Sequence, residues 1–474
     1  MPENNKPQQV KKIDLAVRSA LWLGPLKSQA KAGSRKGSQP GSQLGSQLGM
    51  PKQAKGQLVD VLVAKGRIVS VAPAGSLDVR AAREVDARGL LLLPSLTDAH
   101  THLREPGQEY KEDIASGLSA AAAGGFSNIM CMANTRPVND NASVTEFMLE
   151  QARKSWPPAV GVGPRLYPIG ALTKGLKGQE LASMADLTAA GCVAFSNDGR
   201  PMESTELMRR AMEYCQDLGR VVIDHCEDPN LAPAAGVNEG AVSSRLGLTG
   251  QPDIAEAIQA ARDVLLAEYL GAPIHLAHIS CEKSVAVIRA AKARGVDVTA
   301  ETCPHYLTLT EEEVAGYSAN AKVNPPLRPR ADVEALLDAL TDGTIDMLAT
   351  DHAPHAAHEK EVEFDQAPCG ISGLDTALAT TWELVRTGRL PFDAFLRAWT
   401  SAPCQRFGLP LCSFAPGDPA DFLLFDQDAA WTVGPETMKS KSKNTPLLGR
   451  ALRGRVVAHF LAGKSVLEMD PTGA

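Results

Sequence analysis

The sequence predicts an α/β fold: a (β/α)₈ barrel of the TIM type, with a small β-sandwich domain formed from both chain ends. Three observations predict it. Short apolar segments typical of strands alternate with amphipathic segments typical of helices from Asp98 to about Ala402. Outside this region the pattern is mainly strand-like. Histidines and aspartates stand directly after several apolar segments, at the end of the strands where a barrel places its chemistry.

The chain of 474 residues is long enough for a main domain and a smaller one. We expect residues 1–96 to form the N-terminal part of the β-domain, 97–402 the barrel, and 403–474 the C-terminal part of the β-domain. Residues 27–56 are rich in Gly, Ser, Gln, Lys and Ala and contain a recurring Gly-Ser-Gln. They lack side chains that could form a core, which predicts a disordered insertion.

Eight strands are expected in the barrel region. They are the run near Leu91–Pro94, followed by Ser127–Met132, Arg165–Ile169, Cys192–Ser196, Val221–Ile223, Pro273–Ala277, Val296–Ala300 and Met347–Ala349. Helices are predicted between them, for example at Lys111–Ala123, Glu203–Leu218, Asp253–Leu270, Glu282–Ala293 and Ala331–Leu340. A doubly wound open sheet is the competing architecture, but no Gly-x-Gly-x-x-Gly follows a first strand.

Both ends of the chain show the period-two pattern of strands. Alternating apolar residues in 13–23 and 58–72 predict a β-hairpin. After Ala402 further strands are predicted at Asp421–Asp426, Ala429–Val433 and Ala451–Leu461. Because the two ends look alike, we expect them to pair into one small β-domain.

Composition excludes several classes of partner. Charged residues make up 22% of the chain and the net charge is -7, so no basic footprint for nucleic acid is present. No apolar run approaches the roughly 20 residues that span a bilayer, and the N-terminus lacks the apolar core of a signal peptide. Nine cysteines without a Cys-x-x-Cys pair indicate reduced thiols and a cytoplasmic location.

His100 and His102 lie two residues apart after an apolar run. Side chains at this spacing in a strand point the same way, and two neutral imidazoles can hold a divalent metal such as zinc. Two hydrogen-bonded histidines in a turn are the alternative interpretation. Arg104, two residues further on, is a permanently charged fork suited to a carboxylate.

The ends of four other predicted strands carry metal-type residues: Asp198, His225, His278, and Asp351 with His355. Each alone fits a hydrogen-bonded core residue. Together they predict a metal site, because a barrel brings its strand ends to one face. His352 is interpreted as an orienting or packing residue. His275 lies three residues before His278, on the opposite face of the strand, and is interpreted as structural.

Several motifs together resemble dihydroorotases of the bacterial class I type, within the amidohydrolase superfamily. They are Asp98-Ala-His-Thr-His-Leu-Arg-Glu-Pro-Gly107, Met132-Ala-Asn-Thr-Arg-Pro137, Gly170-Ala-Leu-Thr-Lys-Gly175, Asp224-His-Cys-Glu227, Asn324-Pro-Pro-Leu-Arg328 and Ala349-Thr-Asp-His-Ala-Pro-His355. The resemblance covers roughly residues 58–465 and omits the insertion. It implies a cyclic amide hydrolase that interconverts N-carbamoyl-L-aspartate and L-dihydroorotate in de novo pyrimidine synthesis.

The resemblance implies two zinc ions per subunit. His100, His102 and Asp351 would hold the more buried ion, His225 and His278 the more exposed one, and Asp198 would bridge them. Many relatives bridge with a carbamylated lysine, but the strand before Asp198 contains none, and Lys174 belongs to a different loop. Asp351 would also be the catalytic base.

The resemblance further implies a small-molecule substrate held through its carboxylate and ring. The residues implied are His102, Arg104, Asn134, Asn324, His355 and the Cys369-Gly370 backbone, and relatives commonly carry an aromatic residue at position 369. An allantoinase or hydantoinase is the nearest alternative, and a non-catalytic scaffold for aspartate transcarbamoylase is a second. A homodimer and a complex with aspartate transcarbamoylase are the protein partners implied.

Overall fold

The computed structural model describes residues 12–24, 56–157, 160–232 and 236–468. The predicted insertion, apart from Gly56, lies outside the described residues. The chain divides into two compact units. One contains Met1–Ser95, Leu411–Gln427 and Val456–Ala474, and the other contains Leu96–Pro410 and Asp428–Arg455.

The second unit contains an eight-stranded parallel sheet in sequential order, which confirms the predicted barrel. Its strands are β6 (Leu96–Thr101), β7 (Phe126–Cys131), β8 (Arg165–Ala171), β9 (Ala194–Ser196), β10 (Val222–Asp224), β11 (Ile274–Leu276), β12 (Val298–Thr302) and β13 (Met347–Leu348). The first strand meets the last where the amide of His102 donates to the carbonyl of His352 at 2.8 Å. The sheet is thereby nearly closed, and the carboxyl ends of its strands share one face.

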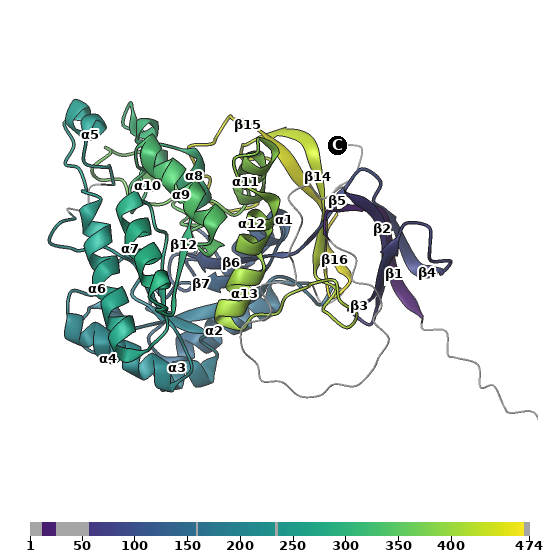
Figure 1. The fold of residues 1–474 in the computed structure, drawn as a ribbon, viewed down its shortest axis with the longest axis horizontal. Helices are drawn as coiled ribbons and strands as arrows, with labels where there is room; N and C mark the ends of the chain where they lie inside the picture. The colour runs from purple at the N-terminus through teal and green to yellow at the C-terminus, as the bar shows by residue number, and fades with distance from the viewer. Residues whose placement is uncertain (1–11, 25–55, 158–159, 233–235, 469–474) are drawn as a thin grey trace, which may run out of the picture. The chain divides into compact units, whose positions relative to one another are not determined.

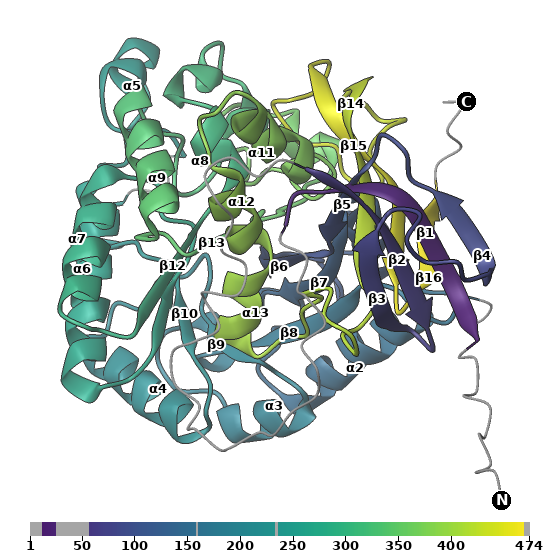
Figure 2. The ribbon, with the colours of Figure 1, turned by 45° about the vertical axis from the view of Figure 1, so that its right-hand side comes forward.

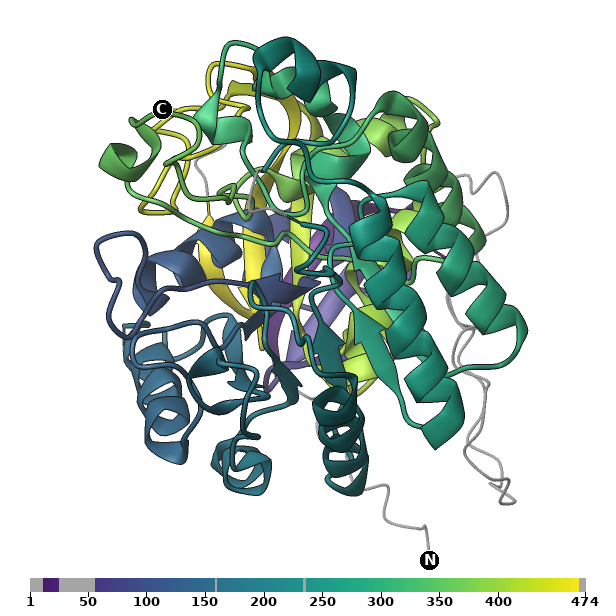
Figure 3. The ribbon, with the colours of Figure 1, turned by 90° about the vertical axis from the view of Figure 1, so that its left-hand side faces the viewer.

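Helices lie outside these strands (Figures 1 and 3). They are α1 (Ile114–Gly124), α2 (Ala142–Lys154), α3 (Met184–Ala190), α4 (Thr205–Asp217), α5 (Ala241–Leu246), α6 (Ile254–Leu270), α7 (Glu282–Ala293), α8 (Pro304–Thr308), α9 (Arg330–Asp342), α10 (Ala357–Lys360), α11 (Ala377–Arg386), α12 (Phe392–Trp399) and α13 (Ser401–Phe407). Short 3₁₀ helices occur at Lys174–Leu176, Glu311–Val314 and Ala319–Ala321. Within the described ranges, no helix has the length and apolar character needed to cross a membrane.

Helix α1 shows how local sequence sets an element's ends. The carboxylate of Asp113 accepts from the amide of Ser116 at 2.7 Å and caps the first turn. Gly125 ends the helix with a φ of 87°, a left-handed conformation that glycine adopts without strain. Its carbonyl then accepts from the amide of Leu96 at 2.8 Å, which ties the helix end to the start of the first barrel strand.

The predicted first barrel strand is wrong. Leu91–Pro94 forms β5, which belongs to the other unit and pairs antiparallel with β14 and parallel with β1. The first barrel strand is β6, which begins immediately afterwards at Leu96. Both strands are completely buried and only Ser95 separates them, so the sequence pattern does not mark where one sheet ends and the other begins.

A second, mixed eight-stranded sheet is made from both ends of the chain, as predicted (Figure 2). Its strands are β1 (Ile13–Trp22), β2 (Gln57–Ala64), β3 (Arg67–Pro73), β4 (Ala81–Asp86), β5, β14 (Phe422–Thr432), β15 (Ala451–Leu461) and β16 (Lys464–Glu468). Leu15, Val17, Val59, Phe422 and Phe460 belong to its core. The two strands predicted between residues 421 and 433 are a single strand, Phe422–Thr432, which continues through the polar residues 426–428.

Candidate metal centre

A cavity of about 230 Å³ opens where the barrel strands end. All residues predicted to bind metal or substrate line it except His100, which is fully buried beside it. The lining residues are His102, Arg104, Asn134, Asp198, Gly199, His225, His278, Val323, Asn324, Asp351, Ala353, His355, Cys369 and Gly370. The structure therefore brings together side chains that lie up to about 270 positions apart.

Three residues of this cluster have left-handed backbone. The φ angles are 62° at Arg104, 36° at His278 and 45° at Asp351. Non-glycine residues rarely adopt such angles, and surrounding structure must hold them. At Asp351 this support comes from Asp98, whose carboxylate accepts from both the amide and the hydroxyl of the preceding Thr350, at 3.0 and 2.5 Å.

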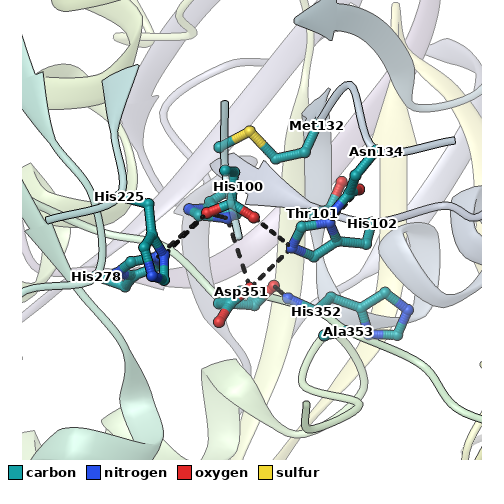
Figure 4. A network of polar contacts seen from close by, with 12 residues as sticks. His100, Thr101, His102, Met132, Asn134, His225, His278, Asp351, His352 and Ala353 are labelled. Atoms are coloured by element: carbon teal, nitrogen blue, oxygen red, sulfur yellow. Dashed lines mark hydrogen bonds and ion pairs between the residues drawn. The ribbon is translucent and has the colours of Figure 1, made fainter. Parts of the chain in front are cut away.

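The first group of candidate ligands surrounds His100 and His102 (Figure 4). His102 Nε2 lies 3.1 Å from Asp351 Oδ1 and 3.5 Å from Asp198 Oδ2. His100 Nε2 lies 3.5 Å from Oδ1 of each of these two carboxylates. It has no hydrogen-bond partner among the described residues although it is fully buried. Two imidazoles and two carboxylates thus direct their donor atoms at one point.

The second group adjoins the first through Asp198. Nδ1 of His225 and Nε2 of His278 lie 2.9 Å apart. They lie 3.5 and 3.2 Å from Asp198 Oδ1, respectively. Asp198 therefore belongs to both groups, and it is the only described residue whose carboxylate faces all four imidazoles.

The spacing of these atoms suits a divalent metal ion. Four ligands at about 2.0–2.1 Å from a tetrahedral zinc ion are about 3.3–3.4 Å apart. In the first group the paired nitrogen and oxygen donors lie 3.1 to 3.5 Å apart. Imidazole and carboxylate are also the ligand types that such ions prefer, so the residues present fit a metal site.

The other ring nitrogens of three of these histidines are held by acceptors. Nδ1 of His100 lies 2.7 Å from Glu301, and Nδ1 of His102 lies 2.8 Å from the amide oxygen of Asn134. Nε2 of His225 lies 3.3 Å from Glu227. A partner on the far nitrogen fixes the proton there and leaves the near nitrogen free to ligate.

The electrostatics of the cluster favour positive charge. Burial lowers the pKa of His225, but the carboxylates of Asp198 and Glu227 outweigh it and raise the value to about 10. Burial would raise the pKa of Asp198, yet the imidazoles of His100, His225 and His278 hold it well below its usual value. A negative potential that stabilises an imidazolium stabilises a bound divalent cation for the same reason.

Arg104 supplies a positive charge to the same cavity. It is 8% exposed, and its Nε donates to the carbonyl of Pro354 at 3.1 Å. No carboxylate lies within ion-pair distance of its guanidinium in the part of the chain that the structure describes. A buried guanidinium without an acidic partner is a site for an anion that enters from outside.

His355 lies beside this guanidinium as a neutral ring. Burial, together with the charges of Arg104, Lys111 and Lys360, lowers the pKa of His355 far below its usual range. Nε2 of His355 lies 2.9 Å from the carbonyl of Cys369 and donates to it. Nε2 of His355 also lies 3.3 Å from the terminal nitrogen Nη2 of Arg104, so the neutral ring and the guanidinium are in direct contact.

The ring-binding candidates are held by a second network. Asn324 donates to Glu227 at 2.7 Å and accepts from Gln251 at 3.1 Å. The amide of Gly370 donates to the carbonyl of Lys322 at 2.9 Å, which fixes the Cys369-Gly370 segment. Burial raises the pKa of the Cys369 thiol above its usual value, which favours the protonated thiol.

Two carboxylates were missed by the sequence interpretation. Glu301 contacts both His100 and His275, and Glu227 contacts His225 and Asn324. Glu227 stands in the Asp224-His-Cys-Glu227 motif but was given no role, whereas Glu301 lies inside β12 and not after a strand. The only available signal was an acidic residue within an apolar strand.

His275 was interpreted as structural, and it is not among the residues that line the cavity, but the strand-face argument for this interpretation does not hold. It was placed on the opposite face from His278, but β11 ends at Leu276 and His278 has left-handed backbone. Strand alternation therefore does not extend to His278. His275 reaches the ligand cluster through Glu301.

Barrel and site together define a protein of the TIM-barrel class with a His/Asp cluster suited to a divalent metal. The chain is 46% identical over 420 residues to the dihydroorotase of Syntrophus aciditrophicus, covering 89% of this chain and 97% of that one. It is 48% identical over 421 residues to the dihydroorotase of Pelotomaculum thermopropionicum, covering 88% and 96%. The chain belongs to the dihydroorotase family.

A family model and solved structures give two further comparisons. Residues 89–284 match the family model described as dihydro-orotase-like. Among solved structures, L-hydantoinase (dihydropyrimidinase) from Arthrobacter aurescens has a TM-score of 0.79 at 22% identity over 96% of both chains. Dihydropyrimidinase from Brevibacillus agri has a TM-score of 0.77 at 21% identity over 96% and 95%. These structures share the fold.

Proposed function

We propose that this chain interconverts N-carbamoyl-L-aspartate and L-dihydroorotate in de novo pyrimidine synthesis, as a dihydroorotase of the bacterial class I type. The observation that carries the proposal is Arg104. Its buried guanidinium lacks an acidic partner among the described residues and lines the same cavity as the metal-type cluster. Both substrates carry the carboxylate that such a guanidinium recognises.

We propose two zinc ions per chain. His100, His102 and Asp351 would hold one, His225 and His278 the other, with Asp198 between them. When bound, such a pair activates a water molecule as nucleophile and polarises the amide carbonyl.

Asp351 is proposed as the group that moves the proton. Its Oδ1 faces His100 and His102, while no described residue hydrogen-bonds to its Oδ2. In hydrolysis, Oδ2 takes a proton from the water whose oxygen bonds to the ring carbonyl carbon. The carbon–nitrogen bond then breaks, and the same proton passes to the departing nitrogen. Ring closure is the reverse sequence and releases water.

The substrate carboxylate would be bound by Arg104, Asn134 and His355. The ring would be bound by Asn324 and the Cys369-Gly370 backbone. His102 contributes both as a ligand and as part of the cavity wall. The ring carbonyl is thereby directed at the metal-type cluster.

A hydantoinase or allantoinase is the second candidate, because the solved structures of similar fold include hydantoinases. Hydantoin and allantoin rings carry no carboxylate for Arg104. A non-catalytic scaffold is disfavoured since all six proposed ligands are present and face one cavity region.

The purified protein should turn over L-dihydroorotate and N-carbamoyl-L-aspartate much faster than allantoin. Ring closure consumes one proton, because the reacting carboxylate disappears, so low pH should favour the ring at equilibrium and high pH the open form. Assays in both directions across pH, with allantoin in parallel, measure both expectations. Faster turnover of allantoin would make the chain an allantoinase instead.

Metal analysis tests the proposed ligands. The wild-type protein should hold about two zinc ions per chain. His225→Ala should lose the second ion and lower kcat by more than about 10²-fold, beyond the effect of changing a residue behind a ligand. His358→Ala, which removes an exposed histidine outside the cluster, is the matched control. Full turnover by His225→Ala would exclude this ligand set.

A homodimer, association with aspartate transcarbamoylase, and a cytoplasmic location complete the proposal. All nine cysteines are free thiols in the structure, which is compatible with a reducing compartment. Mass measurement of the protein alone and mixed with aspartate transcarbamoylase tests the two associations.

A further inference from the structure

A single buried carboxylate connects one metal-site histidine to a histidine outside the site. Glu301, in β12, has a side chain that is 1% exposed. Its Oε1 lies 2.7 Å from Nδ1 of His100, and its Oε2 lies 3.1 Å from Nε2 of His275. Each oxygen therefore has its own imidazole partner.

His275 is fixed at its other end as well. It pairs in register with Thr299 of β12, and its Nδ1 lies 2.9 Å from the Thr299 hydroxyl. Thr299 and Glu301 are two residues apart in one strand and so share a face. The imidazole also packs edge-on against Phe407, with ring centroids 5.4 Å apart. His275 thus has one possible orientation.

The donors and acceptors in the contacts between His100, Glu301 and His275 determine which ring nitrogens carry a hydrogen. A carboxylate only accepts, so each imidazole nitrogen that faces Glu301 must carry a hydrogen. His275 then accepts at Nδ1 from the Thr299 hydroxyl. His100 carries its hydrogen on Nδ1, which leaves the lone pair on Nε2, the atom directed at Asp198 and Asp351.

We propose that Glu301 is a positioning residue that sets the tautomer and orientation of His100 for metal binding, and that His275 and Thr299 hold Glu301 in place. The inference rests on the proposed metal site. It assigns a role to His275 and Glu301, neither of which touches the cavity.

The two histidines of the first group are held by different acceptors. His102 donates to the neutral amide oxygen of Asn134, whereas His100 donates to a full negative charge. A charged acceptor strengthens the hydrogen bond and makes the opposite nitrogen a better ligand. Loss of the Glu301 charge should therefore weaken metal binding more than loss of an ordinary buried contact.

The test is the affinity of the full-length protein for Zn²⁺, measured by competition with a chelator. Glu301→Gln should weaken binding by about 10- to 100-fold. The amide group that replaces one oxygen donates, so one of the two imidazoles must change tautomer. Glu256→Gln is the matched control. It neutralises another buried carboxylate, which contacts Ser280 and Arg328, and should leave Zn²⁺ affinity unchanged.

A second pair of variants keeps the test decisive if Glu301→Gln does not fold. His275→Gln retains an N–H for Glu301 and should keep Zn²⁺ affinity close to wild type, whereas His275→Leu removes it and should weaken binding several-fold. Wild-type affinity in Glu301→Gln would overturn the inference, and so would wild-type affinity in His275→Leu where Glu301→Gln does not fold. Absence of Zn²⁺ binding in the wild-type protein would instead overturn the proposed metal site.

Discussion

Replacing Arg104 by methionine should lower kcat/KM for L-dihydroorotate by about 10²- to 10³-fold, because the substrate carboxylate would be buried without its charged partner. The guanidinium is 8% exposed, so solvent cannot take its place. The loss should appear in both directions of the reaction, since both substrates carry this carboxylate. Steady-state kinetics in each direction measure it.

The zinc content of Arg104→Met should stay at the wild-type level, since Arg104 is not a ligand. Arg200→Met is the control, because Arg200 directly follows the cavity residue Gly199 but is exposed. An exposed charge is screened by salt, so its removal should change kcat/KM little. Equal effects of the two substitutions would contradict a specific carboxylate contact.

Asp351→Asn should lower kcat by about 10³- to 10⁴-fold, at the upper end of the contribution of a proton-transferring side chain. Asparagine has nearly the same shape but cannot take up the proton. Burial would raise the pKa of the Asp351 carboxyl, yet the imidazoles of His100 and His102 keep it below its usual value. The Asp351 carboxylate of the wild-type protein is therefore ionised throughout the neutral pH range, and the substitution removes this proton acceptor.

The values of kcat/KM in the two directions should fall by the same factor, because their ratio is set by the equilibrium constant, which the substitution cannot change. Zinc analysis of the same preparation separates loss of the base from loss of the metal. Glu361→Gln, which alters an exposed carboxyl, should be near wild type. A variant that keeps its zinc and more than a tenth of the wild-type kcat would exclude Asp351 as the base.

The barrel could be predicted because each strand and helix carries its own periodicity. β11 (Ile274–Leu276) and α7 (Glu282–Ala293) were recovered within a residue or two. The error at Leu91–Pro94 has a physical cause. Completely buried strands show no alternation, so neither the change of sheet nor the strand's direction leaves a trace in the pattern.

The candidate ligands could be predicted because they stand at the ends of strands or just after them. His225 and His278 follow β10 and β11 and lie 2.9 Å apart at the facing nitrogens. Glu301 could not be found this way, since its partners His100 and His275 come from other strands and only the closed barrel brings them together. Contacts inside the barrel depend on tertiary packing, so they cannot be predicted from the spacing of residues along the chain. The roles of these residues in binding and catalysis stay predictions.

The left-handed backbone at Arg104, His278 and Asp351 means that substitutions which stabilise the fold at these positions would abolish activity. Glycine would relax each position by about 1–3 kcal/mol and would delete a guanidinium, an imidazole or a carboxylate. A library screened only for heat resistance should therefore accumulate glycines at these three positions and yield durable but inert protein.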